Sequence, residues 1–232
     1  MKKYVVFDLN ETLVDTTVIV SCFSNQTLSP RENISRFWNK LFERLQTLAV
    51  TDDFLPFERV VKDVLTDLGE SDALNCVLEK YPLSTVFDDV SETIAELKQH
   101  GISIVVATNS STELIDRLKS VSPLTDVVDK WICFPCSKSL KPAPRSYKYL
   151  EEELHLEDRS QLVYISTHFW DIFAAQKAGL QTLHLGRNTS PASINGQTTI
   201  RVVTVPRMSM IVPICLSLFQ DSTELAIKSK LS

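Results

Sequence analysis

Hydrophobic residues change their spacing along the chain. Short apolar runs bounded by turn residues predict buried strands. These runs lie at residues 4–7, 102–107, 131–134, 162–165 and 182–185, with a candidate edge strand at 200–205. Between them, apolar residues three or four positions apart predict helices around residues 90–97, 114–118, 144–154 and 172–178. Strands that alternate with helices predict an α/β fold with a doubly wound parallel sheet covered on both faces.

The segment from residue 16 to about 85 shows helical spacing and no strand pattern. Ser29, Pro30 and Glu32 have the residue types of a capping box with proline at the first helical position. A second helix runs from Pro56 to Gly69, and a third begins at Ser71. We therefore predict a core domain of residues 1–15 and 86–220, a helical cap domain of residues 16–85, a last helix at 209–219 and a flexible tail of residues 221–232.

The bulk composition is that of an ordinary globular protein. The 232 residues are 44% hydrophobic and 23% charged, with a formal net charge of −5. Lys and Arg are not clustered, so we expect no nucleic acid partner. Only five glycines occur, which excludes a Gly-rich phosphate loop. Asp8 interrupts the first apolar run too early for a signal peptide, and the apolar segment 208–219 is too short for a membrane span, so we expect a cytoplasmic protein without a membrane partner.

Five cysteines, without regular spacing, predict reduced thiols instead of a disulfide framework. Cys133 and Cys136 form a C-x-x-C pair. A zinc site would need a second pair of ligands, and a redox role would need a thioredoxin-like fold around the pair.

Polar side chains follow the predicted strands where those strands end. They are Asp8, the pair Thr108 and Asn109, Lys141, and the segment 166–171. The carboxyl ends of parallel strands meet at one crevice of a doubly wound sheet. There a carboxylate can act as nucleophile, a lysine can stabilise negative charge, and a second carboxylate can activate water.

Each of these residues also has a structural interpretation. Asp8 could cap a turn, and Asn109 could cap the following helix. Lys141 could lie in a solvated loop. Asp171 could stabilise a helix N-terminus through its negative charge. All four together, in this order, indicate a site.

The same residues resemble the motifs of the haloacid dehalogenase superfamily over nearly the whole chain. Phe7-Asp8 to Thr12-Leu13 matches the first motif, Thr108-Asn109 the second, Lys141-Pro142 the third and Ser166–Asp171 the fourth. The resemblance implies a Rossmann-like core with an inserted helical cap, hinges near residues 16 and 85, and a small-molecule substrate.

Two departures distinguish the chain from the family's magnesium phosphatases. Asn10 stands where those enzymes have a second aspartate, and Thr167 replaces the first acid of the fourth motif. Mg²⁺ prefers carboxylate oxygens. The chain is more similar to the L-2-haloacid dehalogenase branch, whose motifs are matched by Lys141, Tyr147 and Trp170-Asp171. This resemblance implies that the protein uses no metal and no organic cofactor and that it forms a possible homodimer.

By this resemblance, Asp8 attacks the halogen-bearing carbon, and water activated by Asp171 cleaves the resulting ester, with Lys141 as the third catalytic residue. Eight further residues are implied to orient these groups or to bind the substrate, with Trp170 lining an apolar pocket. They are Thr12, Asn39, Thr108, Asn109, Tyr147, Ser166, His168 and Trp170.

Three positions depart from the dehalogenase pattern. Asn39 stands in place of a cap arginine that takes the halide, although Arg36 and Arg44 lie on the same predicted helix. Glu11 adds a carboxylate that would repel an anionic substrate if it faced the site. His168 replaces an asparagine, and it could donate a hydrogen bond, titrate near neutral pH, or lie on the surface without a role.

Three hypotheses follow. The chain is a dehalogenase of short 2-haloacids, a related hydrolase of another small substrate such as a phosphate ester, or a non-catalytic relative used for binding or regulation. Phe37 and Trp38 are candidate pocket residues of the cap, or core residues of an amphipathic helix.

Overall fold

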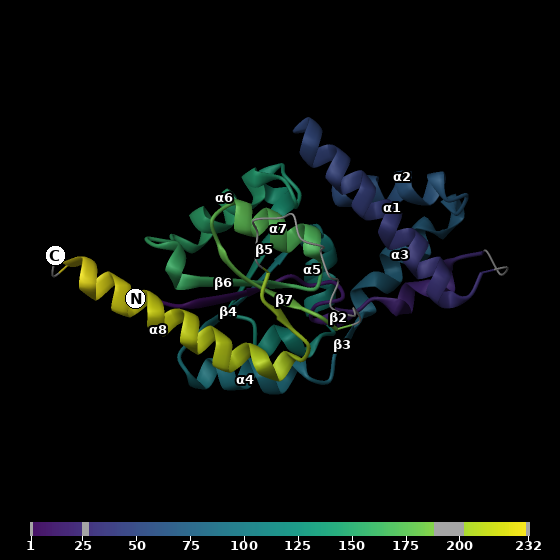
Figure 1. Cartoon of the computed structure of the whole chain (residues 1–232). Helices are drawn as coiled ribbons and strands as arrows, with labels where there is room; N and C mark the ends of the chain where they lie inside the picture. The colour runs from purple at the N-terminus through teal and green to yellow at the C-terminus, as the bar shows by residue number, and fades with distance from the viewer. Residues whose placement is uncertain (1, 25–27, 188–201, 231–232) are drawn as a thin grey trace.

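The computed structural model describes residues 2–24, 28–187 and 202–230, with side chains described up to residue 220. Six parallel strands form one sheet in the order β5-β4-β1-β6-β7-β8 (Figure 1). They are β1 (Tyr4–Phe7), β4 (Ser103–Thr108), β5 (Lys130–Cys133), β6 (Leu162–Ser166), β7 (Gln181–Leu185) and β8 (Thr204–Val205). The predicted fold class is confirmed, with β1 near the middle of the sheet.

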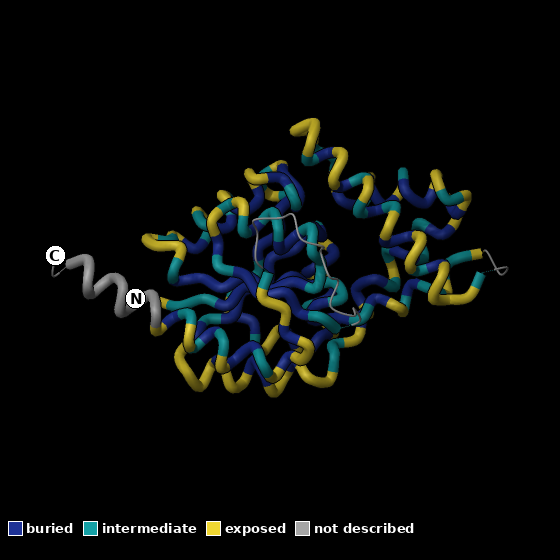
Figure 2. Tube along the Cα trace, viewed as in Figure 1, coloured by how far each residue is buried: buried dark blue, intermediate teal, exposed yellow. Residues whose placement is uncertain are grey.

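Alternating side chains of each strand pack on opposite faces of the sheet because the side-chain period of a strand is two. Val5 and Phe7 belong to the apolar core cluster that also contains side chains of α4 (Val90–Gln99), α5 (Thr112–Lys119) and α8 (Ile211–Lys230). Val6 instead joins the core with α6 (Pro144–Leu154) and α7 (Phe169–Lys177). Figure 1 shows α4 and α8 together below the sheet and α6 and α7 above it, and Figure 2 shows the sheet itself deeply buried.

Three α-helices form a separate layer beyond the carboxyl ends of the strands (Figure 1). They are α1 (Pro30–Thr51), α2 (Phe57–Asp67) and α3 (Leu74–Lys80). The predicted capping box of α1 is present, with Ser29 and Glu32 bonded reciprocally. Short 3-10 segments complete this layer at Thr17–Cys22, Ser71–Ala73 and Tyr81–Leu83. Its apolar core also includes Leu114 and Leu140 of the sheet domain.

The chain passes into and out of the helical layer through a short antiparallel pair, β2 (Val14–Asp15) and β3 (Thr85–Val86). Val14 pairs with Val86 and Asp15 with Thr85. This pair lies where the two predicted domain boundaries meet. The division into a core and a cap stays a prediction.

The C-terminal prediction needs two corrections. The last helix does not stop near residue 219, since α8 continues to Lys230; the segment after Gln220 contains no proline or glycine that would end it. Residues 231–232 lie outside the described part. The edge strand is shorter than predicted and comprises Thr204–Val205, while residues 200–201 are not described. The N-cap of α5 is Ser111, whose side chain accepts a hydrogen bond from the backbone N–H of Leu114.

The prediction that all cysteines are reduced is wrong. Cys22 and Cys76 form a disulfide between the end of the first 3-10 segment and α3. Their sequence separation of 54 residues conceals this proximity, since folding brings their Cα atoms to 5.6 Å. Disulfides are uncommon in reducing compartments, and the cytoplasmic location stays a prediction.

The C-x-x-C pair is not bridged. Cys133 is buried and Cys136 is exposed, and both are free. Burial raises the pKa of the Cys133 thiol to about 11, which disfavours the reactive thiolate. Among the described residues, no helix is long and apolar enough to cross a membrane.

Removing the disulfide tests its contribution to stability. The Cys22→Ser/Cys76→Ser variant should lose about 2–4 kcal/mol of unfolding free energy, because a crosslink over a long loop restricts the unfolded chain. Urea denaturation without reductant measures the loss. Thiol titration of the denatured wild-type chain should find three free thiols, and five would contradict the bridge.

Candidate active site

Asp8 follows β1 and lies between the neighbouring strands β4 and β6. Its backbone N–H donates to the Ile165 carbonyl, which continues the parallel ladder. Its carboxylate accepts hydrogen bonds from Lys141 Nζ at 2.7 Å and from Thr12 Oγ1 at 3.0 Å. Asp8 is thus a buried, held carboxylate at the carboxyl edge of the sheet, and it does not serve merely as a turn cap.

The Lys141 ammonium lies between two carboxylates. Its Nζ donates to Asp8 Oδ1 and to Asp171 Oδ2, each at 2.7 Å, and to the hydroxyl of Tyr164 at 2.8 Å. The side chain is 1% exposed. Burial alone would lower the pKa of Lys141, but the charges and hydrogen bonds of Asp171 and Asp8 outweigh burial and raise it above its ordinary value. Lys141 is therefore a fixed cation, and it is not a solvated loop residue.

Asp171 is enclosed by hydrogen-bond donors. The Tyr147 hydroxyl donates to Oδ1 at 2.6 Å, and the Tyr164 hydroxyl donates to Oδ2 at 3.0 Å. Burial, followed by the charge of Asp171, raises the pKa of both tyrosines well above the ordinary value, so both remain donors. Tyr164 was not predicted, because it stands within an apolar strand. The signal was available: a buried tyrosine hydroxyl needs a partner.

Asn109 holds the backbone of Lys141 from both sides. Its Oδ1 accepts from Lys141 N at 2.7 Å, and its Nδ2 donates to Lys141 O at 3.0 Å. Thr108 Oγ1 accepts the backbone N–H of Ser110. Since Ser111 caps α5, the helix-cap interpretation of Asn109 is wrong, and Asn109 instead positions the lysine.

The loop that precedes α7 is attached to the loop that follows β1. The backbone N–H of Thr167 donates to Thr12 Oγ1 at 3.1 Å, and that of His168 donates to Ser166 Oγ at 3.1 Å. Thr12, Ser166 and Tyr147 are fully buried, and they support charged or loop groups without lining the pocket described below. The roles predicted for them were to orient the catalytic groups or to bind the substrate, and their position outside the pocket favours the first.

Glu11 does not face the pocket. It has a left-handed backbone (φ 58°), and its carboxylate accepts hydrogen bonds from the backbone and side chain of Thr16. Thr16 Oγ1 in turn accepts from Trp38 Nε1 at 3.1 Å. The repulsion expected for a carboxylate facing the site does not arise. This chain of bonds instead joins the nucleophile loop to α1.

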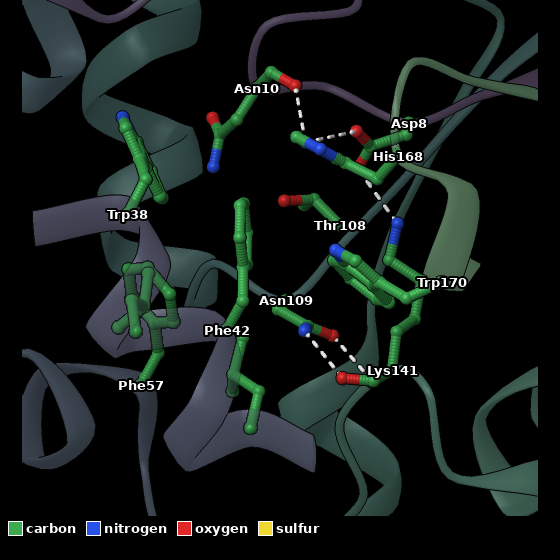
Figure 3. Close-up of a pocket in the computed structure, with 12 residues that line it drawn as sticks. Asp8, Asn10, Trp38, Phe42, Phe57, Thr108, Asn109, Lys141, His168 and Trp170 are labelled. Atoms are coloured by element: carbon green, nitrogen blue, oxygen red, sulfur yellow. Dashed lines mark hydrogen bonds and ion pairs between the residues drawn. The ribbon is translucent and has the colours of Figure 1, made fainter. Parts of the chain in front are cut away.

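A small pocket opens above Asp8 (Figure 3). Its volume of about 20 Å³ has room for about one water molecule. Its walls are largely aromatic: Phe42 lies 4.8 Å from the His168 ring and 5.3 Å from the Trp170 ring, between ring centroids. The lining residues are Asp8, Asn10, Trp38, Leu41, Phe42, Leu45, Phe57, Thr108, Asn109, Lys141, His168 and Trp170.

The helical layer contributes one of the two predicted aromatic residues to the pocket, together with others that were not predicted. Trp38 lines the pocket, while Phe37 is buried in the core of the helical layer. Asn39 is exposed, donates to Ser35 and lines a separate surface hollow with Arg36, so we remove it from the candidate substrate-binding residues. Arg44 pairs with Asp67 at 2.8 Å. Among the described residues, no arginine lines the pocket.

Asn10 is held at the pocket wall by a tyrosine of the helical layer. The Tyr81 hydroxyl donates to Asn10 Oδ1 at 2.6 Å and lies 2.6 Å from Ser110 Oγ. Neither Asn10 nor Tyr81 was a predicted site residue, although Asn10 was noted as a departure from phosphatases.

The donor set does not fit a hard divalent cation. Asp8 and Asp171 both bind the Lys141 ammonium, so a positive charge already lies between them. Across residues 2–24, 28–187 and 202–220, no group of three or more His, Cys, Asp or Glu side chains could hold a metal ion. Asn10 and Thr167 supply no replacement carboxylate.

Lys141 should be essential for stability. Lys141→Met leaves two buried carboxylates without their counter-charge, and it should lower the unfolding free energy by about 3–5 kcal/mol. Urea denaturation measures the effect. Lys148→Met on α6 is the matched control, because that lysine is 74% exposed. Equal stability of the two variants would contradict the assigned ion cluster.

Glu11 should make stability depend on pH. Burial raises the pKa of the Glu11 carboxyl in the folded protein, despite the opposing hydrogen bonds of Thr16. A carboxyl whose pKa is higher in the folded than in the unfolded protein stabilises the folded state at pH values below its pKa in the unfolded protein. This stabilisation is lost as the pH rises through its pKa in the folded protein. Wild type should therefore gain stability relative to Glu11→Gln as the pH falls from neutral toward 4. Denaturation across this pH range measures the difference in unfolding free energy between wild type and Glu11→Gln. The control is Glu113→Gln, at an exposed position, for which we expect a difference that does not change with pH. The same constant difference for Glu11→Gln would contradict the raised pKa of Glu11.

Comparison with known proteins identifies the family. The family described as haloacid dehalogenase-like hydrolase matches residues 5–185. The (S)-2-haloacid dehalogenase of Pseudomonas sp. (strain YL) is 26% identical over 204 residues, which cover 84% of this chain and 88% of that protein. Haloacetate dehalogenase H-2 of Moraxella sp. (strain B) is 26% identical over 222 residues, which cover 91% of this chain and 98% of that protein.

Solved structures share the fold. The L-2-haloacid dehalogenase from Xanthobacter autotrophicus superposes with a TM-score of 0.75 at 21% identity, covering 91% of this chain and 97% of that one. The putative HAD-hydrolase YfnB from Bacillus subtilis, bound to magnesium, gives 0.70 at 15% identity, covering 92% and 98%. The resemblance inferred from the four motifs is confirmed. The chain belongs to the haloacid dehalogenase-like hydrolase family.

Proposed function

We propose that this protein is a hydrolytic dehalogenase of short-chain 2-haloalkanoic acids that works through an ester of Asp8. The observation that carries the proposal is the Lys141 ammonium fixed between Asp8 and Asp171 beneath an aromatic pocket. The curated relatives with dehalogenase names support the same chemistry.

In the first step, one carboxylate oxygen of Asp8 attacks the carbon that carries the halogen. A carbon–oxygen bond forms, the carbon–halogen bond breaks, and the halide leaves with the bonding electrons. Lys141 and Thr12 hold the carboxylate in place, so its attack requires little reorganisation. The apolar rings of Trp38, Phe42 and Trp170 enclose the substrate's carbon chain and exclude water.

In the second step, water attacks the carbonyl carbon of the ester. The 2-hydroxy acid leaves with inverted configuration at C2, and the Asp8 carboxylate is restored. Dehalogenation by these two steps therefore needs a nucleophile and a base. Phosphoryl transfer, in contrast, usually needs a metal cation bound to the phosphate. The donor set at Asp8 does not fit that cation.

Trp170 offers a donor for an anionic substrate. Its Nε1–H is buried and has no hydrogen-bond partner among the described residues. An unpaired buried donor is costly, and a substrate carboxylate or departing halide would satisfy it. Thr108 and Lys141 line the same pocket, so we assign these three residues to the substrate site.

A cytoplasmic location and a homodimer, both implied at the sequence level, remain proposals. Sedimentation velocity measures the oligomeric state directly.

Halide release tests the proposed function. Wild type should release chloride from (S)-2-chloropropionate and bromide from bromoacetate in buffer with EDTA. Asp8→Asn should lower the rate by about a thousandfold or more, because it removes the nucleophile. Asp88→Asn, at an exposed aspartate, is the matched control and should retain full activity.

Two outcomes would contradict the proposal. Halide release no faster than that of Asp8→Asn, across several haloacids, would favour a non-catalytic relative. Hydrolysis of a phosphate ester that requires added Mg²⁺ would favour a phosphatase.

A further inference from the structure

Most hydrogen-bond donors that line the pocket already have partners. All three N–H groups of the Lys141 ammonium are engaged by the two buried carboxylates and a phenol. Trp38 Nε1 donates to Thr16 Oγ1, and the Thr108 hydroxyl donates to Ser110 Oγ. An anion that enters the pocket needs free donors, because aromatic walls cannot replace the water that the anion loses.

The side-chain amide of Asn10 is free to donate. Its Oδ1 accepts a hydrogen bond from the Tyr81 hydroxyl at 2.6 Å, while its Nδ2 makes no hydrogen bond to any residue that the structure describes. Asn10 lines the pocket, and Figure 3 shows its amide nitrogen pointing into the pocket, toward Trp38 and Phe42. Two N–H groups of Asn10 are therefore available to a bound anion.

A line of three hydroxyl groups decides which end of this amide faces the pocket. Thr108 Oγ1 donates to Ser110 Oγ at 3.2 Å, and Ser110 Oγ lies 2.6 Å from the Tyr81 hydroxyl. The Ser110 proton can then go to Tyr81, and the Tyr81 proton goes to Asn10 Oδ1. If the amide were turned round, Tyr81 would donate to Ser110, and the Ser110 proton would have no acceptor in this line. A buried donor without an acceptor is costly, so the line selects the orientation with Nδ2 in the pocket.

These hydroxyl groups connect the helical layer to the sheet. Tyr81 begins the last 3-10 segment of the helical layer, while Thr108 ends β4 and Ser110 follows it. All three side chains are buried, which strengthens hydrogen bonds between them. Burial also raises the pKa of the Tyr81 hydroxyl above its ordinary value, so this hydroxyl remains a donor. The Asn10 amide is thus oriented by a residue of the helical layer.

The position of the amide fits the leaving halide. Displacement by Asp8 places the halide on the side of the carbon that faces away from the attacking oxygen. In Figure 3 the Asp8 carboxylate lies beside His168, whereas Asn10 Nδ2 points toward the rings of Trp38 and Phe42. The halide gains its negative charge as the carbon–halogen bond breaks, so N–H groups aimed at it stabilise the transition state more than the bound substrate. The neutral amide also does not compete for the Asp8 charge, as a cation would.

We propose that Asn10 binds the departing halide through Nδ2 and that Tyr81 is the positioning residue for its amide; this rests on the proposed function. As the carbon–oxygen bond to Asp8 forms, the carbon–halogen bond breaks, and the halide takes the bonding electrons while Nδ2–H donates a hydrogen bond to it. No proton is transferred. The amide stays neutral, and the halide then leaves the pocket.

Two leaving groups test the role of Asn10. Single-turnover rates of ester formation are measured with chloroacetate and with bromoacetate. Asn10→Leu should lower the rate with chloroacetate about a hundredfold, as loss of an oxyanion-hole donor does, but the rate with bromoacetate only about tenfold, because bromide is the better leaving group. Added bromide should also inhibit this variant less than wild type. Asn10→Ala should give the same pattern without a larger side chain, and Asn75→Leu, at an exposed position, is the matched control.

Tyr81→Phe tests the positioning role. The variant keeps the buried ring but removes the hydroxyl that holds the amide. The rate with chloroacetate should fall about tenfold, the size of one lost hydrogen bond, and the preference for bromoacetate should rise as it does in Asn10→Leu. Adding Tyr81→Phe to Asn10→Leu should cause no further loss, because the two residues act as one unit. Tyr149→Phe on α6 is the matched control, since Tyr149 does not line the pocket.

The outcomes separate the roles. Equal slowing with both substrates and a higher KM in Asn10→Leu would assign the amide to the substrate carboxylate and overturn the inference. Unchanged rates in both Asn10 variants would also overturn it, as would a Tyr81→Phe variant that loses stability but keeps the wild-type ratio of the two rates. Failure of wild type to release halide from either substrate would instead overturn the proposed function, and with it this inference.

Discussion

The site depends on one buried ammonium between two buried carboxylates. Isolated buried charges are costly, and removing any member of such a cluster leaves the others uncompensated. Lys141 lies 2.7 Å from both Asp8 and Asp171, so the ends of β1 and the start of α7 are held at fixed positions relative to the lysine loop. Asn109 extends this constraint to the end of β4 by binding the lysine backbone. Four segments far apart in sequence thus meet at Lys141.

The same cluster gives its members different tasks. Asp8 is the member that also lines the pocket, while Asp171 faces the phenols of Tyr147 and Tyr164. Asp8 and Asp171 have the same chemistry, and they differ in whether the carboxylate can be reached from the pocket. His168 borders the pocket beside Asp8, where its ring stacks on Trp170 and packs at a tilt against Phe42. The pocket combines a fixed anion, an imidazole and apolar walls.

The sequence could predict the sheet and the order of its strands along the chain. It could also predict that four polar residues lie close together, because strand ends converge in a doubly wound sheet. They are Asp8, Asn109, Lys141 and Asp171. Contacts that depend on three-dimensional proximity could not be predicted. Cys22 and Cys76 give no sequence signal of their pairing, and Tyr164 reads as one more apolar residue of a buried strand. Asn39 was placed in the site by motif alignment, but its position on α1 directs it to the surface, whereas Phe42, three residues later, reaches the pocket. The helix period explains this, because Trp38 and Phe42 are four residues apart and share the face that lines the pocket, while Asn39 is rotated from Trp38 by about 100° around the helix.

The disulfide has a mechanical consequence for the pocket. Cys22 precedes α1 and Cys76 lies in α3, so the bridge closes a covalent ring that contains both α1 and α2. Trp38 and Phe42 come from α1 and Phe57 from α2, and these walls therefore belong to one tethered body. We expect this body to tilt about the paired strands β2 and β3 at its base when the pocket admits a substrate larger than the resting cavity. Reduction would open this ring and leave α1, α2 and α3 joined to one another by their apolar core.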